Sequence, residues 1–505
     1  MGGLLGLVAG CNMITGADGV EFYDDSTVET PDDTTTADGP EPLELGEPRL
    51  PRALDYFTAA EGVTLSRITL NQGVQRVLME DGEAVLDGEV PVIAGRPGLL
   101  RVFYETDAAY EGVPITARLY VDEEPVVEQA VTLEAASEPG DLGSTINFDL
   151  EDADVTPGGR YRVELLQAGP SGSTKNPGAT FPTDGDASLD AEVGPTLNVV
   201  VVPIRYEADG SGRMPDTSQT QLALYEEMFY ALYPTAKLNI TVHAPMVWNQ
   251  AVAARGDSWS DLLSAVADLR QSENASFDTY YYGVFKPRSS VSNFCSDGCY
   301  YGLGYVAGDD SDYGKASIGL GYSGRRFVET AMHEVGHNHG RPHTPCGGPS
   351  NPDPDYPHPN ARIGTWGYNI FTGELHSPTG ERRDWMSYCD PTWMSDYSFR
   401  EVFDRLSLVN QAADFQVPPS LQNLSWRRIE VRSGHADTRV PITLRRPPRG
   451  EAVPVTVDTT QGQVGATARF LPYDHIDGGV LFVPPTASGL VSAQVGGTSF
   501  QIYLP

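Results

Sequence analysis

The segment His333-Glu-Val-Gly-His337-Asn-His-Gly340-Arg-Pro-His343 constrains this chain more than any other part of its sequence. His333 and His337 are four residues apart, so on a helix they lie about 40° apart on one face. Two imidazoles placed in this way can share one zinc ion. Gly340 is expected to end the helix at a positive φ. The returning chain then allows His343 to complete a three-histidine site that leaves a fourth position for water.

Glu334 directly follows the first histidine, where it can reach a metal-bound water without being a ligand itself. His339 is predicted to be a non-ligand, because it lies two residues past His337 on the other side of the helix. The alternative is a set of three surface histidines near a helix end. A chance match at five fixed positions is rare in a chain of this composition, so we favour the metal site.

The same segment resembles the HExxHxxGxxH signature of the metzincin zinc endopeptidases. Members of that clan also have a methionine-containing turn beneath the metal, and Asp384-Trp-Met386-Ser-Tyr388-Cys389 fits it. The resemblance covers roughly residues 197–415. It implies a catalytic Zn²⁺ with Met386 beneath it, and a role for Tyr388 in stabilising the oxyanion. Ordinary packing is the alternative for both residues.

The chain is too long for one hydrophobic core and is expected to fold as several domains. Residues 60–170 and 420–505 contain short alternating strands separated by turns, which predict an antiparallel β-sandwich on each side of the catalytic domain. The expected fold class is therefore an α+β metzincin-like domain, with a mixed sheet and an active-site helix, flanked by two β-sandwiches. The expected segments of the chain are a signal-like segment at 1–11, an acidic disordered tether at 12–48, the first β-sandwich at 60–170, the zinc protease domain at 196–416 and the second β-sandwich at 420–505. Whether residues 62–170 form a pro-region or a permanent domain is open.

Three further features belong to the catalytic region. By the same resemblance, residues 301–306 form the edge strand above the cleft, where an extended substrate could pair. Asp309, Asp310 and Asp312 could bind Ca²⁺, although a solvated acidic turn is favoured over a calcium site. Ser395 is a candidate N-cap for the helix that follows the methionine turn.

The five cysteines indicate export. Val8-Ala9-Gly10-Cys11 resembles a lipoprotein signal in which the cysteine is lipidated, although no Lys or Arg precedes it. The remaining even number fits two disulfides. Cys295–Cys299 and Cys346–Cys389 are favoured among the three connectivities that four cysteines allow. We therefore expect a protein that is lipid-anchored at the bacterial cell surface or outer membrane, or secreted.

The formal net charge of −35 argues against nucleic acid as a partner, because phosphates would be repelled. The sequence contains no apolar run of 18 residues, so contact with a membrane is expected only through a lipid at Cys11. The expected protein is a monomer that cleaves extracellular proteins or glycoproteins, with Glu334 as general base. The alternatives are a surface binding protein with a non-catalytic zinc site and a zinc hydrolase acting on a non-peptide amide.

Overall fold

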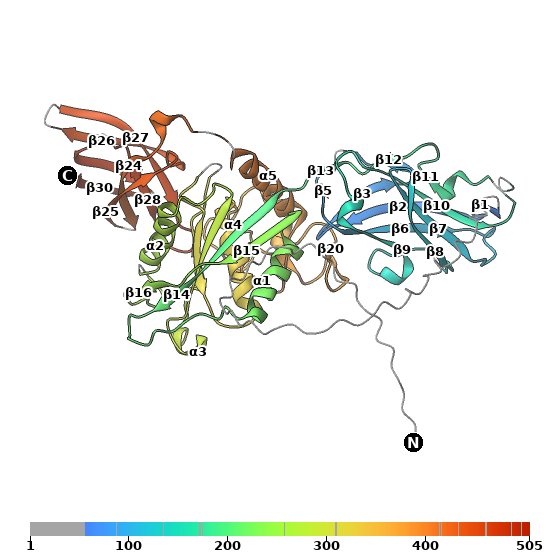
Figure 1. Cartoon of the computed structure of the whole chain (residues 1–505), viewed down its shortest axis with the longest axis horizontal. Helices are drawn as coiled ribbons and strands as arrows, with labels where there is room; N and C mark the ends of the chain where they lie inside the picture. The colour runs from blue at the N-terminus through green and yellow to red at the C-terminus, as the bar shows by residue number, and fades with distance from the viewer. Residues whose placement is uncertain are drawn as a thin grey trace, which may run out of the picture.

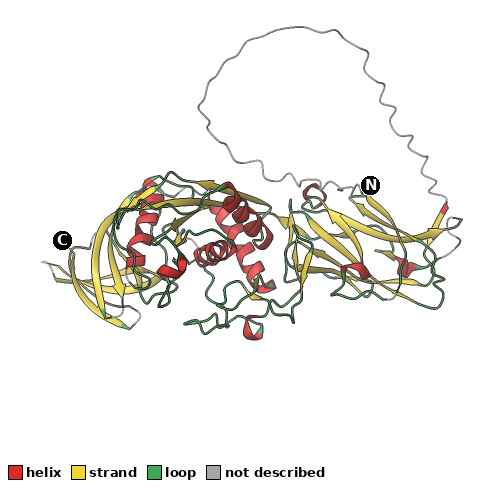
Figure 2. Ribbon diagram, turned by 90° about the horizontal axis from the view of Figure 1, so that it is seen from below, coloured by secondary structure: helices red, strands yellow, loops and turns green. Residues whose placement is uncertain are grey.

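The computed structural model describes residues 56–504 except 87, 135, 171, 172, 174, 257, 309, 310, 414, 416, 433, 460, 461, 486 and 496. The described chain forms three parts in a row, and the part that contains the histidine segment lies in the middle (Figures 1 and 2). The predicted signal-like segment 1–11, the tether 12–48 and Cys11 lie outside the described residues.

The N-terminal part contains two antiparallel sheets that share one hydrophobic core. Strand β8 (Glu124–Val131) alternates between exposed and partly buried side chains along its whole length, as expected for a strand with one solvated face. The first sheet has the order β4 (Glu83–Ala84), β3 (Gln75–Glu80), β2 (Val63–Asn71), β6 (Gly98–Thr106) and β9 (Ile146–Leu150). The second has β1 (Phe57–Ala59), β10 (Arg160–Ala168), β7 (Ile115–Val121) and β8 (Glu124–Val131), with β11 (Thr180–Phe181) and β12 (Ala187–Ser188) also paired to β10.

A buried cation joins this N-terminal part to the central domain. The guanidinium of Arg96 is fully buried and donates to the backbone carbonyls of Tyr233 and Thr235 at 3.0 and 2.8 Å. Ile93 packs into the central core from strand β5 (Val92–Ala94), which pairs in parallel with β13 (Ala191–Val193). A desolvated, hydrogen-bonded arginine is costly to expose without its partners. These contacts favour a permanent domain over a removable pro-region.

The central domain is built on a mixed sheet with helices on both faces (Figure 1). Its strand order is β15 (Lys237–Val242), β14 (Thr196–Tyr206), β17 (Thr279–Phe285), β19 (Ala316–Leu320) and β18 (Gly302–Gly304), with β16 (Met246–Trp248) also paired to β14. All neighbours are parallel except β18, which runs antiparallel to β19 at the edge. The predicted edge position of residues 301–306 therefore agrees with the sheet order.

Alternate residues of the central strand β17 pack against different helices. Tyr280 and Tyr282 of β17 share a core with α1 (Gln219–Leu232), α4 (Arg325–Asn338) and α5 (Asp396–Ala413). Tyr281 and Phe285 belong to another core with α2 (Ser258–Ser272), near the short α3 (Val291–Phe294). The segment after α4 adds the two small pairs β20 (Gly367–Asn369) with β21 (Glu374–His376) and β22 (Arg383–Asp384) with β23 (Thr392–Trp393).

The C-terminal part is one seven-stranded antiparallel sheet that folds back on itself, because its two end strands, β25 (His435–Leu444) and β30 (Thr498–Leu504), contact each other. The β-sandwich expected from the sequence stays a prediction. Leu481, on one face of β28 (Gly479–Val483), packs in the core between the strands of this sheet. Phe482, on the other face, joins the core that contains α2. The central domain therefore covers part of the outer face of this sheet. The order is β25 (His435–Leu444), β24 (Leu424–Arg432), β28 (Gly479–Val483), β27 (Gly462–Pro472), β26 (Glu451–Thr459), β29 (Gly489–Val495) and β30 (Thr498–Leu504).

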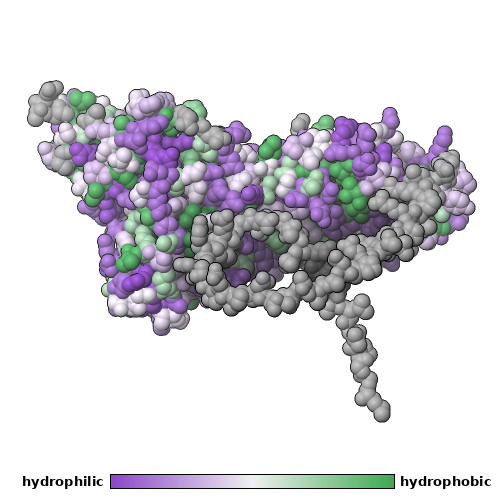
Figure 3. Space-filling model, in the orientation of Figure 1, coloured by the Kyte–Doolittle hydropathy of each residue, from purple (hydrophilic) through white to green (hydrophobic). Residues whose placement is uncertain are grey.

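The surface drawn in Figure 3 is mostly hydrophilic outside the grey atoms, with scattered hydrophobic side chains. Among the described residues, no helix combines the length and the apolar composition needed to cross a bilayer.

Candidate metal centre

The three predicted histidines converge at the C-terminal end of α4. Nε2 of His337 lies 3.2 Å from Nε2 of His333 and 3.2 Å from Nε2 of His343. Gly340 has a φ of 81°, and a Cβ at this position would lie 2.8 Å from the carbonyl oxygen of Ala307. Glycine is therefore needed for both the backbone conformation and the close approach. It returns the chain so that His343 faces the two helical histidines.

The ring orientation of the two helical histidines suits a metal ligand. Nδ1 of His333 contacts the carbonyl oxygen of Trp385 at 3.0 Å, and Nδ1 of His337 contacts that of Arg341 at 2.7 Å. A proton on each Nδ1 leaves each Nε2 free to bind a metal. Burial lowers the pKa of His337 to about 4, which keeps the ring in the neutral, metal-binding form at neutral pH.

The spacing of the three histidines fits a zinc ion. Nitrogen ligands at tetrahedral angles and 2.0–2.1 Å from zinc are separated by about 3.3 Å from one another. The two separations of 3.2 Å that involve His337 are close to this value. His333, His337 and His343 would therefore hold the ion. His475 lies close by, since the ligand atoms of all four histidines lie within 4.8 Å of one another.

Met386 packs against α4, and its expected place beneath the metal stays a prediction. Its side chain is fully buried, and a Cβ on Gly336 of α4 would lie 2.6 Å from its sulfur. The turn is fastened by the buried carboxylate of Asp384, which accepts hydrogen bonds from the backbone N–H of Met386 and from Ser395. The hydroxyl of Ser395 in turn accepts the N–H of Ser398, as expected for the N-cap of α5.

Tyr388 lies at the rim of the centre and is 45% exposed. Its ring centroid is 4.6 Å from that of His343, and its hydroxyl contacts Nδ1 of His475 at 2.8 Å. The disulfide Cys346–Cys389 closes the insertion next to it, and Cys295–Cys299 forms the second bridge. Both favoured cysteine pairs are therefore present.

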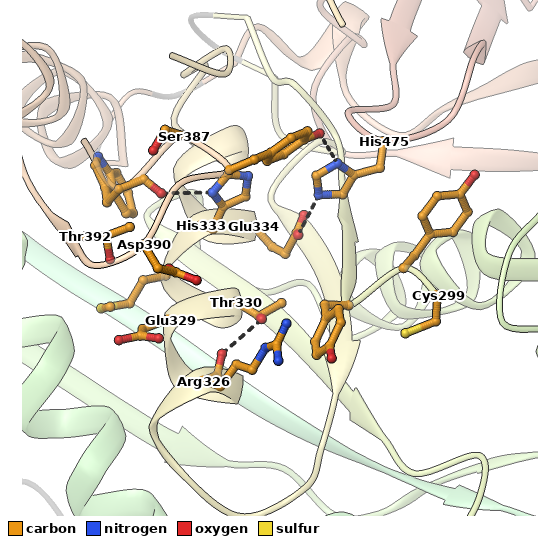
Figure 4. A pocket seen from close by; sticks show the side chains of 15 residues that line it. Cys299, Arg326, Glu329, Thr330, His333, Glu334, Ser387, Asp390, Thr392 and His475 are labelled. Atoms are coloured by element: carbon orange, nitrogen blue, oxygen red, sulfur yellow. Dashed lines mark hydrogen bonds and ion pairs between the residues drawn. The ribbon is translucent and has the colours of Figure 1, made fainter. Parts of the chain in front are cut away.

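Glu334 points from α4 into the same space, and its side chain is 1% exposed. Nε2 of His475 lies 3.2 Å from its Oε1, and Oε2 has no hydrogen-bond partner in the described part of the chain. Figure 4 shows the contact between Glu334 and His475, with His333 beside them. Asp474, the residue before His475, is completely buried, and its Oδ2 lies 3.4 Å from Nε2 of His337.

The two buried carboxylates have opposite pKa shifts. Burial raises the pKa of Glu334 well above its ordinary value, and the neighbouring Asp474 adds to this shift. Burial would also raise the pKa of Asp474, but His475, His337 and the N–H of Gly304 outweigh it and hold that pKa below its usual range. Two carboxylates and several imidazoles in one buried space form a donor set suited to a cation.

Two cavities meet at His475. One, of about 440 Å³, extends past Tyr301, Glu334 and Tyr388. The other, of about 460 Å³, extends past Val306 and His343 into the C-terminal part. His475 lines both cavities, so it lies at the point where the cleft passes the candidate metal centre.

Three predictions have different outcomes. His339 is buried against the ring of Tyr280 and takes no part in the histidine cluster, as predicted. Asp312 is not part of a solvated turn: it is buried and accepts a hydrogen bond from Arg270 at 2.9 Å, which makes it one half of an internal ion pair. Asp309 and Asp310 lie outside the described residues, so a calcium site stays a prediction.

Asp474 and His475 were not found from the sequence. His475 is one of nine histidines, and it lies 141 residues after Glu334 in a β-rich segment. Its neighbours form no metal-binding or catalytic motif. Only the packing of the C-terminal sheet brings the two residues to the centre.

A family model described as Peptidase M66 matches residues 301–403. The match begins at the edge strand and includes the three histidines, Glu334, the methionine turn and the first part of α5. The chain therefore carries a metallopeptidase domain. The matched family and the cluster of histidines and carboxylates together indicate a metal site suited to zinc.

No curated protein matches the sequence. Among solved structures, 29 chains match. One of these is described as the structure of a chaperone–substrate complex, with 13% sequence identity and a TM-score of 0.23. The match covers 53% of this chain and 38% of that chain. Such a low score informs neither the fold nor the function of this metallopeptidase.

Proposed function

We propose that this metallopeptidase is a metzincin-type zinc endopeptidase that cleaves extracellular proteins or glycoproteins. The observation that supports the proposal most directly is the placement of Glu334 beside three histidines whose Nε2 atoms are spaced for one zinc ion. This carboxylate faces the cavity of about 440 Å³. A site with only a structural metal would need neither the adjacent base nor the open space.

The reaction follows from the position of the side chains. A zinc ion held by His333, His337 and His343 would lower the pKa of a water molecule and would polarise the scissile carbonyl. Glu334 accepts the proton of the attacking water at a carboxylate oxygen and then passes it to the leaving amine. The exposed Tyr388 hydroxyl is the proposed hydrogen-bond donor to the oxyanion.

Mass-spectrometric mapping of cleavage in a denatured protein mixture tests the proposal, with wild type beside Glu334→Gln. We expect cleavage sites with wild type only, and one zinc ion per chain in both proteins. Equal cleavage by the variant would contradict the role of Glu334. A wild-type protein that holds zinc but cleaves neither proteins nor glycoproteins would contradict the endopeptidase proposal.

The role of His343 can be tested separately by competition for zinc with a chelator. His343→Ala should bind zinc more weakly, because it leaves two histidine ligands on α4. His435→Ala is the matched control, since His435 is exposed on the C-terminal sheet. A full metal complement in His343→Ala at limiting free zinc would remove His343 from the ligand set.

We also propose that the protein is exported and lipid-anchored through Cys11, on the basis of the cysteine pairing and the lipobox-like segment. Labelling with a fatty-acid analogue should mark the full chain in its host, and Cys11→Ser should abolish the label. Label retained by that variant would exclude Cys11 as the anchor.

A further inference from the structure

The segment that joins β27 to β28 adds to the edge strand of the catalytic sheet. The N–H of Val306 donates to the carbonyl oxygen of Pro472 at 3.1 Å, and the N–H of Asp474 donates to that of Gly304 at 3.3 Å. Tyr305 and Tyr473 form an antiparallel bridge between these two contacts. The C-terminal sheet is thus joined by backbone hydrogen bonds to the edge strand above the candidate metal centre.

This pairing places two charged or polar side chains in the centre. Oδ1 of Asp474 accepts the N–H of Gly304 at 3.0 Å, so the carboxylate is fastened to the edge strand itself. His475 follows and bridges the hydroxyl of Tyr388, 2.8 Å from its Nδ1, to the carboxylate of Glu334, 3.2 Å from its Nε2. Its ring is held from both sides, and its side chain is 15% exposed towards the cleft.

The C-terminal sheet is firmly joined to the catalytic domain. Leu471, Tyr473 and Phe482 share a core with Trp259 and other residues of the central domain. Beside that core, Arg428 forms an ion pair with Asp268 at 2.6 Å. A detachable inhibitory domain would be expected to have a smaller and more polar contact than this. The joined core favours a constant contribution of residues 473–475 to the site.

We propose that His475 is a positioning residue of the peptidase reaction, supplied to the active centre by the C-terminal sheet. Its Nε2–H donates to Oε1 of Glu334 and fixes the rotamer of the carboxylate. The contact between the Tyr388 hydroxyl and Nδ1 of His475 holds the orientation of the ring. The inference rests on the proposed function, because it assigns His475 to the proton transfer that Glu334 performs.

The test compares His475→Ala, His475→Gln and His435→Ala with wild type, using steady-state cleavage of one peptide together with zinc content. His475→Ala should lower kcat by roughly 10- to 100-fold, with KM changed less than threefold and one zinc retained, since the effect acts through the base. His475→Gln should recover part of kcat, because its side-chain amide can also donate to Glu334. His435→Ala should match wild type.

Other outcomes would overturn the inference. Faster cleavage by His475→Ala would make the contact inhibitory, and loss of zinc would make His475 a ligand. An unchanged kcat would leave it no role in the reaction. If His475→Ala does not fold, His475→Gln is compared with His475→Leu, which cannot form the hydrogen bond. Equal kcat values for these two variants would exclude a role for hydrogen bonding to Glu334. Absence of cleavage by zinc-loaded wild type would instead contradict the endopeptidase proposal itself.

Discussion

The carboxylate of Asp384 accepts the backbone N–H of Met386 at 3.0 Å, and this contact fixes the methionine turn. Asp384 is fully buried and also accepts the N–H and the hydroxyl of Ser395 at 3.1 and 2.6 Å. One side chain thus joins the methionine turn to the start of α5. The turn is held from within the core and does not depend on the metal alone.

Replacing Asp384 with alanine should destabilise the fold and weaken zinc binding. The change leaves several buried donors without an acceptor, and each such donor costs about 1–3 kcal/mol. Thermal unfolding and a zinc titration measure the two effects. Glu381→Ala is the control, because Glu381 lies in the same insertion with an exposed side chain. Equal unfolding temperatures for Asp384→Ala and wild type would show that the turn does not need this carboxylate.

Gly336→Ala should also destabilise the protein, although alanine is the better helix former. An added Cβ would lie 2.6 Å from both the sulfur of Met386 and the ring of Trp385. Overpacking of this kind costs about 1–3 kcal/mol, which exceeds the gain of about 1 kcal/mol in helix propensity. Chemical denaturation measures the net effect. Gly465→Ala is the control, since a Cβ there meets no atom within 4 Å. A more stable Gly336→Ala would refute the close packing of the turn against α4.

The motif around the zinc site could be predicted from the sequence because its geometry is local. A spacing of four places His333 and His337 on one helical face, and Gly340 determines where the chain returns. The contribution of His475 is not local. It depends on an edge strand and a sheet more than a hundred residues apart in sequence, so the chain around His475 carries no signal of its role.

The docking of the C-terminal part on the catalytic domain could not be predicted for a related reason. Alternating burial along a strand indicates a covered face, but it does not say what covers that face. Leu481 packs in the core between the strands of the C-terminal sheet, and Phe482 packs in the core that contains α2. Only the tertiary contact shows that both faces of β28 are covered.

The joint between the C-terminal sheet and the catalytic domain should weaken in acid. Glu430 is buried at this joint, where it accepts the hydroxyl of Ser260 at 2.6 Å and that of Tyr473 at 3.2 Å and contacts Arg432 and Arg439. Burial would raise the pKa of Glu430, but the Ser260 hydrogen bond and the two arginines outweigh it and lower that pKa. A carboxylate with a lowered folded-state pKa stabilises the fold fully above its unfolded pKa, which is about 4.3.

That stabilisation is lost as the pH falls through the folded-state pKa of Glu430. Calorimetry from pH 7 to pH 3 should show a falling Tm for wild type. Glu430→Gln should be about 2 kcal/mol less stable at pH 7 and should depend less on pH below about 4.5. Asp437→Asn, at an exposed position on β25, should follow wild type. Parallel Tm curves for Glu430→Gln and wild type would exclude Glu430 as a source of acid sensitivity.

Extending a peptide substrate on the C-terminal side of the scissile bond should raise kcat/KM more than extending it on the N-terminal side. On the side of β18 that faces away from β19, the backbone groups of Gly304 and Val306 are already paired with residues 472–474. The next backbone groups on that side, which a substrate could pair with, are those of Gly302, beside Glu334. An antiparallel substrate at Gly302 would run in the direction of residues 472–474, and its upstream residues would meet that segment. Its downstream residues would extend along the cavity of about 440 Å³ past Tyr301.

Fluorogenic peptides with a common core can measure this asymmetry. Each residue added after the scissile bond should raise kcat/KM until the cavity is filled, because each adds contacts along an open surface. Residues added before the bond should raise kcat/KM less than twofold beyond the first one or two, because the edge strand has no free backbone groups there. Glu334→Gln supplies the background rate. A tenfold gain from upstream extension would mean that residues 472–474 leave the edge strand when substrate binds, and that the C-terminal segment competes with the substrate.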